Sequence, residues 1–346
     1  MAQSADDVLT RVDGTTGVIV LNRPRAINSL NQSMIEAIGA FLSKWEHDDN
    51  VHQVVLSGAG ERGFCAGGDV IALYHSARGN GAAARRFWYD EYRLNAQIAR
   101  YPKAVVTLMD GIVMGGGVGL GAHASVRVVT DTSKIAMPEV GIGFVPDVGG
   151  TYLLSRAPGL LGLHAALTGT PITGADAVAM GLGDHYVHQT TLTEFEQTII
   201  DDGIEAALTA YTVQPPASTL VAQQSWIDEC YAGDTVGVIL DQLRKHDAAE
   251  ANDAAVIIAT RSPTALAVTL RALRRARDLR SLEDVLRQEF RVSCAALRSH
   301  DFIEGIRAQL IDKDRNPRWM PTSLSAVSDE DVETIFTATC EEIRFE

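Results

Sequence analysis

The sequence predicts an α/β fold of layered sheets with helical crossovers, followed by a helical C-terminal region. In the first half, short apolar runs typical of buried strands alternate with segments of helical periodicity. After about residue 190 the strand patterns fade and helical periodicity continues. We therefore expect an α/β core over residues 1–195 and a helical region over residues 196–346.

The first predicted elements are a buried strand, an amphipathic helix and a second strand. The strands are expected at Gly17–Leu21 and Gln53–Ser57. Between them, Ser33 and Glu36 have the spacing of a capping box, which places the start of the helix at Ser33. The apolar stripe of this helix comprises Met34, Ile35, Ile38, Phe41, Leu42 and Trp45.

The next segments alternate glycine-rich loops with strands. The loops cover Gly58–Asp69 and Gly111–Gly121, and strands at Ala104–Met109 and Val126–Thr130 bracket the second loop. A further capping box, Thr173-x-x-Asp176, precedes an apolar run at Tyr186 and Val187. Helical periodicity then covers Leu192–Tyr211, Ala217–Tyr231, Val236–His246 and Leu282–Leu297.

Composition and charge exclude several classes of protein. Hydrophobic residues make up 46% of the 346 residues and charged residues 21%, which is the mix of a globular chain. Lys and Arg number 30 against 44 Asp and Glu, so the net charge is −14. A field of that sign repels nucleic acid and anionic membranes, and we expect neither as a partner. The sequence contains no uncharged apolar stretch of 18 residues, so we expect no membrane span.

The cysteines and the N-terminus indicate the compartment. Cys65, Cys230, Cys294 and Cys340 lie far apart, which favours neither a zinc site nor a redox dithiol. The start MAQSADDVLT lacks a basic stretch followed by an apolar run, so no secretory signal is expected. We expect a soluble, cytoplasmic protein without a bound metal.

Three glycine-rich segments are the candidates for chemistry. They are Phe64-Cys65-Ala66-Gly67-Gly68-Asp69, the run from Met114 to Leu120, and Met137-Pro138-Glu139 with Pro146-Asp147-Val148-Gly149-Gly150. Glycine where a strand meets a helix exposes backbone N–H groups to a ligand. Two such N–H groups directed at one oxygen would form an oxyanion hole. The alternative is that these glycines only permit tight turns.

A different interpretation fits the second segment taken alone. Gly117-x-Gly119-x-x-Ala122 matches the dinucleotide fingerprint G-x-G-x-x-G/A. Glu139 follows the fingerprint at the expected distance of about 20 residues. This would make the chain a hydride-transferring enzyme. The fingerprint leaves the other two glycine-rich segments unexplained.

Taken together, the segments resemble the crotonase (enoyl-CoA hydratase/isomerase) superfamily. Its opening motif is similar to Asn22-Arg23-Pro24-x-Ala26-x-Asn28-x-Leu30. Within the superfamily the chain resembles the 3-hydroxyisobutyryl-CoA hydrolase branch, the thioesterases of valine breakdown. The stretches behind that resemblance are Glu91-Tyr92-x-Leu94-Asn95, M-G-G-G-V-G-L at 114–120, A-M-P-E at 136–139, P-D-V-G-G at 146–150, Ser262-Pro263-Thr264, S-H-D-F-x-E-G at 299–305, L-I-D-K-D at 310–314 and Pro317-x-Trp319.

The resemblance implies a crotonase fold of repeated ββα units and a role for each site residue. The N–H groups of Gly68 and Gly116 would form the oxyanion hole, and Glu139 would be the general base or the nucleophile. Asp147 would carry a proton or position water, and Glu91 would contact the substrate. Ala66 and Asp69 belong to the implied substrate-binding set. The alternative for Glu139 and Asp147 is a helix cap or a salt bridge to a residue such as Arg156.

One position distinguishes the hydrolases from the hydratases. Hydratases of the superfamily carry a glutamate at the end of G-G-G-x-E, where this chain has Gly119. Asp147 stands where hydratases usually carry a small residue. An enoyl-CoA hydratase or isomerase remains the first alternative, and a non-catalytic CoA-ester binding protein the second.

The implied partner is an acyl-CoA ester, with coenzyme A as part of the substrate and no separate cofactor. Residues 261–291 are rich in arginine, which suits phosphate binding, although a solvated helix face is the common alternative. The resemblance also implies that the C-terminal helices complete the active site and mediate self-association.

Overall fold

A computed structural model describes residues 7–345, which form two compact units. The first unit takes the described residues up to Gly68, together with Arg93–Ile135 and Ile172–Ser218. The second unit takes Asp69–Tyr92, Ala136–Pro171 and the described residues from Thr219 onward. The chain passes between the units several times, so these units differ from the segments 1–195 and 196–346. That functional division stays a prediction.

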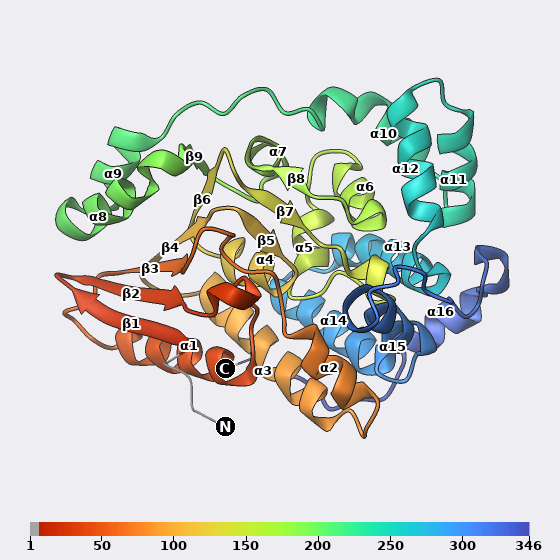
Figure 1. Ribbon diagram of the computed structural model, residues 1–346, viewed down its shortest axis with the longest axis horizontal. Coiled ribbons are helices and arrows are strands. Elements are labelled where there is room, and N and C mark those ends of the chain that lie inside the picture. The colour runs from red at the N-terminus through yellow and green to blue at the C-terminus, as the bar shows by residue number, and fades with distance from the viewer. Residues whose placement is uncertain (1–6, 346) are drawn as a thin grey trace. The chain divides into compact units, whose positions relative to one another are not determined.

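The first unit contains a six-stranded sheet within residues 7–345 (Figure 1). The strand order is β1-β2-β3-β4-β6-β9. β1 and β2 form an antiparallel hairpin, and every later neighbour pairs in parallel. Parallel neighbours require crossover connections, which the intervening helices provide. The bounds are β1 (Val8–Asp13), β2 (Thr16–Leu21), β3 (Gln53–Gly58), β4 (Ala104–Met109), β6 (Val126–Thr130) and β9 (His185–Val187).

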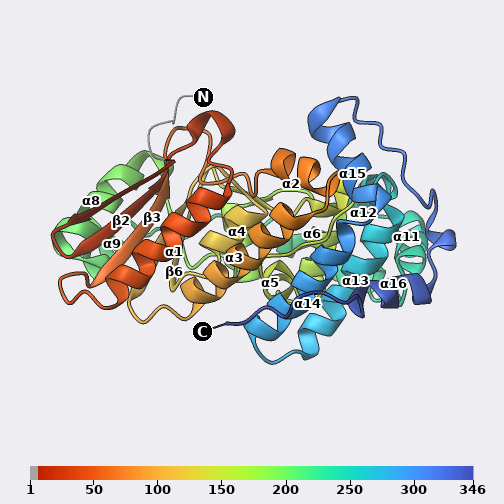
Figure 2. The same ribbon diagram turned by 90° about the horizontal axis from the view of Figure 1, so that it is seen from below.

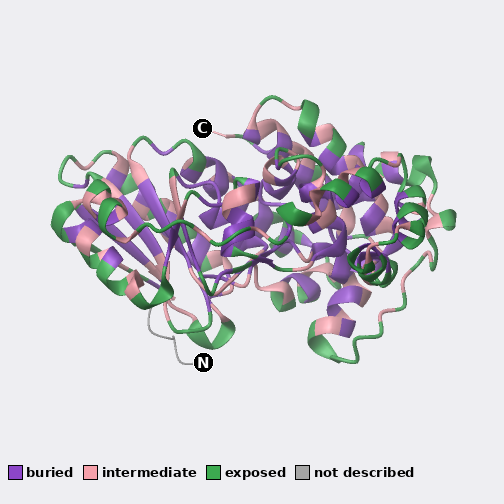
Figure 3. Cartoon of the chain, turned by 90° about the horizontal axis from the view of Figure 1, so that it is seen from above, coloured by how far each residue is buried: buried purple, intermediate pink, exposed green. Residues whose placement is uncertain are grey.

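Helices cover both faces of this sheet, as Figure 2 shows. On one face lies α1 (Gln32–Glu46), whose Trp45 packs against Gly17 of β2. On the other face lie α8 (Leu192–Asp202) and α9 (Ile204–Tyr211). Phe195 and Ile199 of α8 pack on buried valines of the central strands. The strands other than β1 are accordingly buried along much of their length (Figure 3).

A smaller sheet in the described chain has the order β5-β7-β8. In two places a pair of strands precedes a helix, as β1-β2-α1 and as β4-β5-α4, which is the expected ββα repeat. The bounds are β5 (Ile112–Met114), β7 (Lys134–Ala136), β8 (Ile172–Thr173), α4 (Gly116–Gly121) and α7 (Gly174–Met180).

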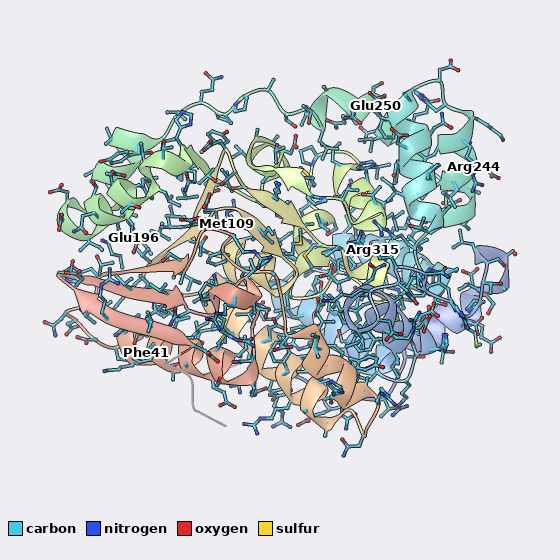
Figure 4. All side chains as sticks on the ribbon, viewed as in Figure 1. Phe41, Met109, Glu196, Arg244, Glu250 and Arg315 are labelled. Carbon is cyan, nitrogen blue, oxygen red and sulfur yellow. The ribbon has the colours of Figure 1, made fainter. Side chains whose placement is uncertain are left out.

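The second unit is mainly helical. Trp88 stacks on Phe144 with ring centroids 5.2 Å apart, and Phe302 packs against both rings. On α11 and α12, Arg244 and Glu250 are exposed at the outer faces of the helices (Figure 4). The helices are α2 (Val70–Ala77), α3 (Ala82–Ala99, of this unit up to Tyr92), α5 (Gly150–Leu154), α6 (Leu161–Thr168), α10 (Gln224–Tyr231), α11 (Val236–Lys245), α12 (Ala249–Ala259), α13 (Pro263–Asp278), α14 (Leu282–Ala296), α15 (His300–Ile306) and α16 (Asp329–Phe336).

Short helical turns complete the described elements of both units. They are the 3₁₀ turns η1 (Pro24–Ala26), η2 (Glu139–Ile142), η3 (Gln189–Thr191), η4 (Val221–Gln223) and η6 (Leu324–Ala326), and the π-helical turn η5 (Arg307–Ile311).

Most predicted elements are confirmed, and the exceptions have local causes. The strands Ala104–Met109 and Val126–Thr130 and the capping box at Thr173 are present as expected. The N-cap of α1 is not Ser33 but Asn31, whose side chain accepts the Met34 N–H at 2.9 Å. Asparagine caps helices as well as serine does, so the capping box was the wrong signal.

Two predicted helices are shorter than the periodicity indicates. Leu192–Tyr211 is interrupted at Gly203, which has φ of +94° and separates α8 from α9. In Ala217–Tyr231 the α-helix begins only at Gln224. The strand Val8–Asp13 was not predicted at all; it has exposed apolar residues and so lacks the pattern of a buried strand.

Among residues 7–345, no single helix has the length and apolar composition needed to cross a membrane. Only α12 and α13 taken together pass that test, and they are bent by 116° at the break between them.

The contact between Gly17 and Trp45 makes a testable pair with Gly39. A Cβ at Gly17 would lie 2.6 Å from the Trp45 ring, whereas a Cβ at Gly39 would meet its nearest atom at 3.6 Å. Gly17→Ala should lower the free energy of unfolding by about 1–3 kcal/mol through overpacking. Gly39→Ala, inside α1, should raise it by roughly 0.5–1 kcal/mol. Urea unfolding of both variants tests this, and equal effects would contradict it.

Candidate active site

Two of the predicted glycine loops are joined to each other within the first unit. The Cys65 N–H donates to the carbonyl of Ile112 at 3.1 Å, and the Met114 N–H donates to the carbonyl of Cys65 at 2.9 Å. A Cβ at Gly117 would lie 2.4 Å from the Cys65 carbonyl oxygen. Glycine is therefore required at 117 because α4 approaches this loop so closely.

This pairing brings the predicted oxyanion donors onto adjacent segments. Within residues 7–345, neither the Gly68 N–H nor the Gly116 N–H donates a hydrogen bond to another group. Gly116 is the first residue of α4, and Gly115 precedes it with φ of +50°. The first N–H groups of a helix lack partners within the helix and point outward from its positive end. Both donors can therefore serve a ligand.

Asn28 from the opening motif holds the first loop in place. Its side chain is fully buried and donates to the carbonyls of Ala59, Gly63 and Phe64 at 3.0–3.2 Å. Its Oδ1 accepts the Arg23 N–H at 2.9 Å. The sequence indicated the motif but not this role, which requires knowing that residues about 30 positions apart are in contact.

Ala66 and Asp69 lie at the ends of the same loop and have structural partners. The Ala66 N–H donates to the carbonyl of Ile27 at 2.9 Å. The Asp69 side chain caps α2 by accepting the Ala72 N–H at 3.3 Å. Their assignment to substrate binding stays a prediction.

The second unit gathers the predicted carboxylates. Glu91 lies on α3, Glu139 begins η2, and Asp147 belongs to the loop before α5. All three are buried, with exposed fractions of 2%, 7% and 5%. Within the described residues, Glu91 Oε1 and Glu139 Oε2 have no hydrogen-bond partner. Buried carboxyl oxygens without donors are costly, which points to a ligand that supplies the donors.

Tyr92 holds the Asp147 side chain by a hydrogen bond, and Ser293 in turn contacts Tyr92. Tyr92 Oη donates to Asp147 Oδ2 at 2.7 Å, and Tyr92 Oη also lies 2.7 Å from Ser293 Oγ. Because the tyrosine has only one proton, the serine donates to Tyr92 when Tyr92 donates to Asp147. The sequence placed Tyr92 in a family motif without a role, and it gave no signal for Ser293.

A fourth buried carboxyl, Glu289 of α14, was missed by the sequence analysis. It accepts hydrogen bonds from the loop that follows Asp147. Helical periodicity placed Leu282–Leu297 correctly, but a glutamate on a helix is usually exposed, and no local signal marked this one as buried.

Burial and mutual repulsion raise the pKa values of these acids. Burial, then the charges of Asp147 and Glu139, hold the pKa of Glu91 well above its ordinary range. Burial and the Asp147 charge do the same to the pKa of Glu139. Burial raises the pKa of Asp147 to about 7, although the Tyr92 hydrogen bond opposes the shift. A carboxyl that titrates near neutral pH suits general acid–base catalysis.

Comparison with known proteins identifies the family. A family model described as enoyl-CoA hydratase/isomerase matches residues 16–336. The chain belongs to the enoyl-CoA hydratase/isomerase family.

Relatives in this family carry two kinds of name. The "3-hydroxyisobutyryl-CoA hydrolase, mitochondrial" of Danio rerio is 38% identical over 348 residues, covering 97% of this chain and 91% of that protein. The human protein of the same name is 38% identical over 344 residues, covering 96% and 89%. A solved structure titled as a carnitinyl-CoA dehydratase from Mycobacterium thermoresistibile is 62% identical, with a TM-score of 0.97 and 99% of each chain covered.

A second solved structure, titled as an enoyl-CoA hydratase from Rhodobacter sphaeroides, is 40% identical with a TM-score of 0.91, covering 96% of this chain and 98% of that one. These neighbours confirm the expected crotonase fold with its helical C-terminal region.

The family match also overturns the dinucleotide-binding alternative. Gly117 of the fingerprint is explained by the close packing of α4 on Cys65.

The basic residues expected near the phosphates or the carboxylates have other partners in this family member. Arg156 stacks over the Tyr152 ring at 3.7 Å and donates to the carbonyls of Ala276 and Leu279. It is therefore not the predicted salt-bridge partner of Glu139 or Asp147.

The arginines of α13 are also engaged in the structure. Arg271 and Arg275 pair with Glu333 of α16, and Arg274 donates to the backbone carbonyls of Gly233 and Asp234. They tie α13 to its neighbours. Among residues 7–345, no cluster of three His, Cys, Asp or Glu side chains could hold a metal ion.

The raised pKa of Asp147 predicts a pH-dependent stability. With a pKa of about 7 when folded against an ordinary 3.8, the folded chain binds more protons than the unfolded chain between these values. Stability should therefore fall as the pH rises from about 4 to about 7. Asp147→Asn removes the buried charge, so its free energy of unfolding should exceed the wild-type value by about 1–3 kcal/mol near pH 8.

The same difference should approach zero near pH 3, below the ordinary pKa of 3.8, where Asp147 is mostly protonated in both states. Urea unfolding at the two pH values measures it. Asp241→Asn, at an exposed position of α11, is the control and should change neither value. A difference of equal size at both pH values would contradict the assignment.

Proposed function

We propose that this chain hydrolyses the thioester of 3-hydroxyisobutyryl-CoA, or of a close β-hydroxyacyl-CoA, to the free acid and CoA. The observation that carries the proposal is the pair of buried acceptors without partners, Glu91 Oε1 and Glu139 Oε2. A water molecule and the β-hydroxyl of the acyl group supply the two donors that these oxygens lack. Glu91 thus orients the acyl group, and Glu139 acts on the water.

The oxyanion is stabilised by the N–H groups of Gly68 and Gly116. Attack on the thioester carbonyl places negative charge on its oxygen, and backbone donors already oriented toward that position need no rearrangement. Their freedom from other acceptors supports the role. Loss of one such donor typically costs about 10²–10³ in rate.

Glu139 can start the reaction in two ways. As a general base it takes a proton from water, and the hydroxide attacks the carbonyl carbon. As a nucleophile its carboxylate attacks that carbon and expels CoA, and water then hydrolyses the anhydride. Both routes consume one water and release one acid and one thiol.

Asp147 donates the proton that the departing CoA thiolate needs. The departing thiolate of CoA needs a proton, and a carboxyl with a pKa of about 7 holds one at neutral pH and releases it readily afterwards. Tyr92 keeps the Asp147 side chain in one orientation through the 2.7 Å hydrogen bond. We propose no metal or redox cofactor in this reaction.

The second candidate is hydration or dehydration of an enoyl-CoA, which the names of the solved neighbours favour. Addition of water across a double bond uses an acid and a base on the same water. In the hydratases one of them follows the glycine triplet, where this chain has Gly119 in α4. Without that carboxylate, and with Asp147 on another loop, thioester hydrolysis fits the residues better.

The setting of the reaction is part of the proposal. Hydrolysis of 3-hydroxyisobutyryl-CoA belongs to valine breakdown. We place the protein in the cytoplasm, although the animal relatives are named as mitochondrial. We also propose self-association through the C-terminal helices, which light scattering of the purified protein would measure.

A substrate panel tests the choice between the two activities. Purified protein is offered 3-hydroxyisobutyryl-CoA, other β-hydroxyacyl-CoA esters, crotonyl-CoA and carnitinyl-CoA. Free thiol is detected with a disulfide reagent, and the enoyl thioester is followed by its ultraviolet absorbance. We expect thiol release from the hydroxyacyl esters with unchanged enoyl absorbance. Enoyl chemistry without thiol release would establish the second candidate instead.

Asp147→Asn tests the proton-transfer role. We expect kcat for thiol release to fall by about 10²–10⁴, because the amide cannot donate and recover a proton at neutral pH. The amide oxygen still accepts the Tyr92 hydrogen bond, so the Kd for the CoA ester should stay within about twofold. Calorimetric binding and thiol release are measured together, with Asp241→Asn as the exposed control. Full activity in Asp147→Asn would contradict the role.

A further inference from the structure

Glu289 is a buried carboxyl to which the proposed chemistry gives no task. Its exposed fraction is 1%. Its Oε2 accepts the Gly149 N–H at 2.6 Å, and its Oε1 accepts the Thr151 N–H at 2.9 Å and the Thr151 hydroxyl at 2.5 Å. Three donors on one carboxylate, all from a segment about 140 residues earlier, fix that segment to α14.

The segment that Glu289 holds is the strained turn that carries Asp147. Val148 has φ of +54° and Gly149 has φ of +78°. A β-branched residue in the left-handed region is disfavoured and persists only where its surroundings impose it. The Gly150 N–H closes the turn on the Asp147 carbonyl at 2.6 Å. The Glu289 contacts, immediately beyond Val148, are placed to impose this conformation.

The same helix also supports the side chain of Asp147. Ser293 follows Glu289 by four residues, and side chains at that spacing lie on one face of a helix. Ser293 contacts Tyr92 Oη, which donates to Asp147 Oδ2. This face of α14 therefore supports the backbone next to Asp147 and, through Tyr92, its carboxylate.

We propose that Glu289 is a positioning residue for the hydrolysis, which fixes the turn at 148–151 and so directs Asp147 at the reacting groups. The proposal rests on the proposed function. Glu289 itself touches neither substrate nor water. It acts through the backbone of Gly149 and Thr151.

Its charge has a second, measurable effect. The Glu289 charge adds to the forces that raise the pKa of Glu139. The other titratable groups that interact with Glu289 are Tyr92 of α3 and Asp147. α13 and α16 also pack on α14, and their shared cluster with it consists of apolar residues, namely Val268, Ala272, Val292, Val332 and Phe336. Burial raises the pKa of Glu289 itself to about 8, against the hydrogen bonds from Thr151 and Gly149, so its charge acts on the other acids mainly above neutral pH.

Glu289→Gln separates positioning from mere stabilisation. Glutamine has the same shape, but its NH₂ group cannot accept from the second backbone N–H. We expect kcat for thiol release to fall by about 10²-fold, as for a misplaced catalytic group, with KM within about threefold. The acidic limb of the pH profile of kcat/KM should stay at the wild-type pH, because Glu289 is uncharged there. Glu283→Gln, on the same helix, is the matched control and should change neither quantity.

Two further variants keep the test decisive. Glu289→Asp retains the carboxyl group with a shorter reach, so its kcat should also fall. Thr151→Val removes only the hydroxyl donor and keeps the shape, and should lower kcat by about tenfold even if Glu289→Gln does not fold. A wild-type kcat in folded Glu289→Gln, or in Thr151→Val where the former fails to fold, would overturn the proposal. So would a rise in KM in Glu289→Gln as large as the fall in kcat.

The wild-type assay separates this inference from the proposed function. If the wild-type protein releases no thiol from any ester, the proposed function fails. Glu289 is then judged without substrate, by carbon-13 NMR titration of the carboxyl groups in the wild type, in Glu289→Gln and, where that variant does not fold, in Thr151→Val. Altered titration of Glu91, Glu139 or Asp147 in the variant would support the positioning role of Glu289. Unchanged titration of these carboxyl groups would overturn that role.

Discussion

The second unit depends on the burial of four carboxyl groups beside one another. Each of them would be more stable in water, and each charge repels the others. The donors to Asp147 and Glu289 within the described chain are hydroxyls and backbone N–H groups rather than arginines. Such donors hold a carboxylate in place without fixing its charge. That combination leaves the protonation of Asp147, whose pKa is about 7, adjustable near neutral pH, at a cost in folding stability.

The first unit differs in that it presents backbone N–H donors that have no acceptor within the described chain. Gly68 and Gly116 keep free N–H groups because the adjoining backbone is committed elsewhere: Gly67 accepts from Leu30, and Cys65 bonds both Ile112 and Met114. The Asn28 side chain holds the first loop in place, and the Asn28 backbone lies in the left-handed region with φ of +54°. Side chains are hardly involved, so single substitutions cannot easily delete the donors. The constraint falls instead on the neighbouring Gly117, where a Cβ would lie 2.4 Å from the Cys65 carbonyl oxygen.

The sequence could predict what depends on local pattern. The strand Ala104–Met109 and the cap at Thr173 follow from alternation and spacing within a few residues, and both are as expected. The cap of α1 was misplaced because Asn31 and Ser33 are both good cap residues and only the backbone decides between them. Asn28 and Glu289 were beyond reach for another reason. Their roles lie in contacts with residues about 30 and 140 positions away.

The two kinds of name among the relatives are compatible with one physical account. A 62% identical chain with a TM-score of 0.97 shares the fold. Under the proposed function, any member acting on a CoA thioester needs an oxyanion site, because the carbonyl oxygen gains charge in each reaction. The reactions diverge in where protons are handled. Overall similarity is insensitive to that, since one residue such as Gly119 or Asp147 barely changes it. Under the proposed function the carboxylates decide between the activities, and here they lie on α3, η2 and the 146–150 loop, supported from α14.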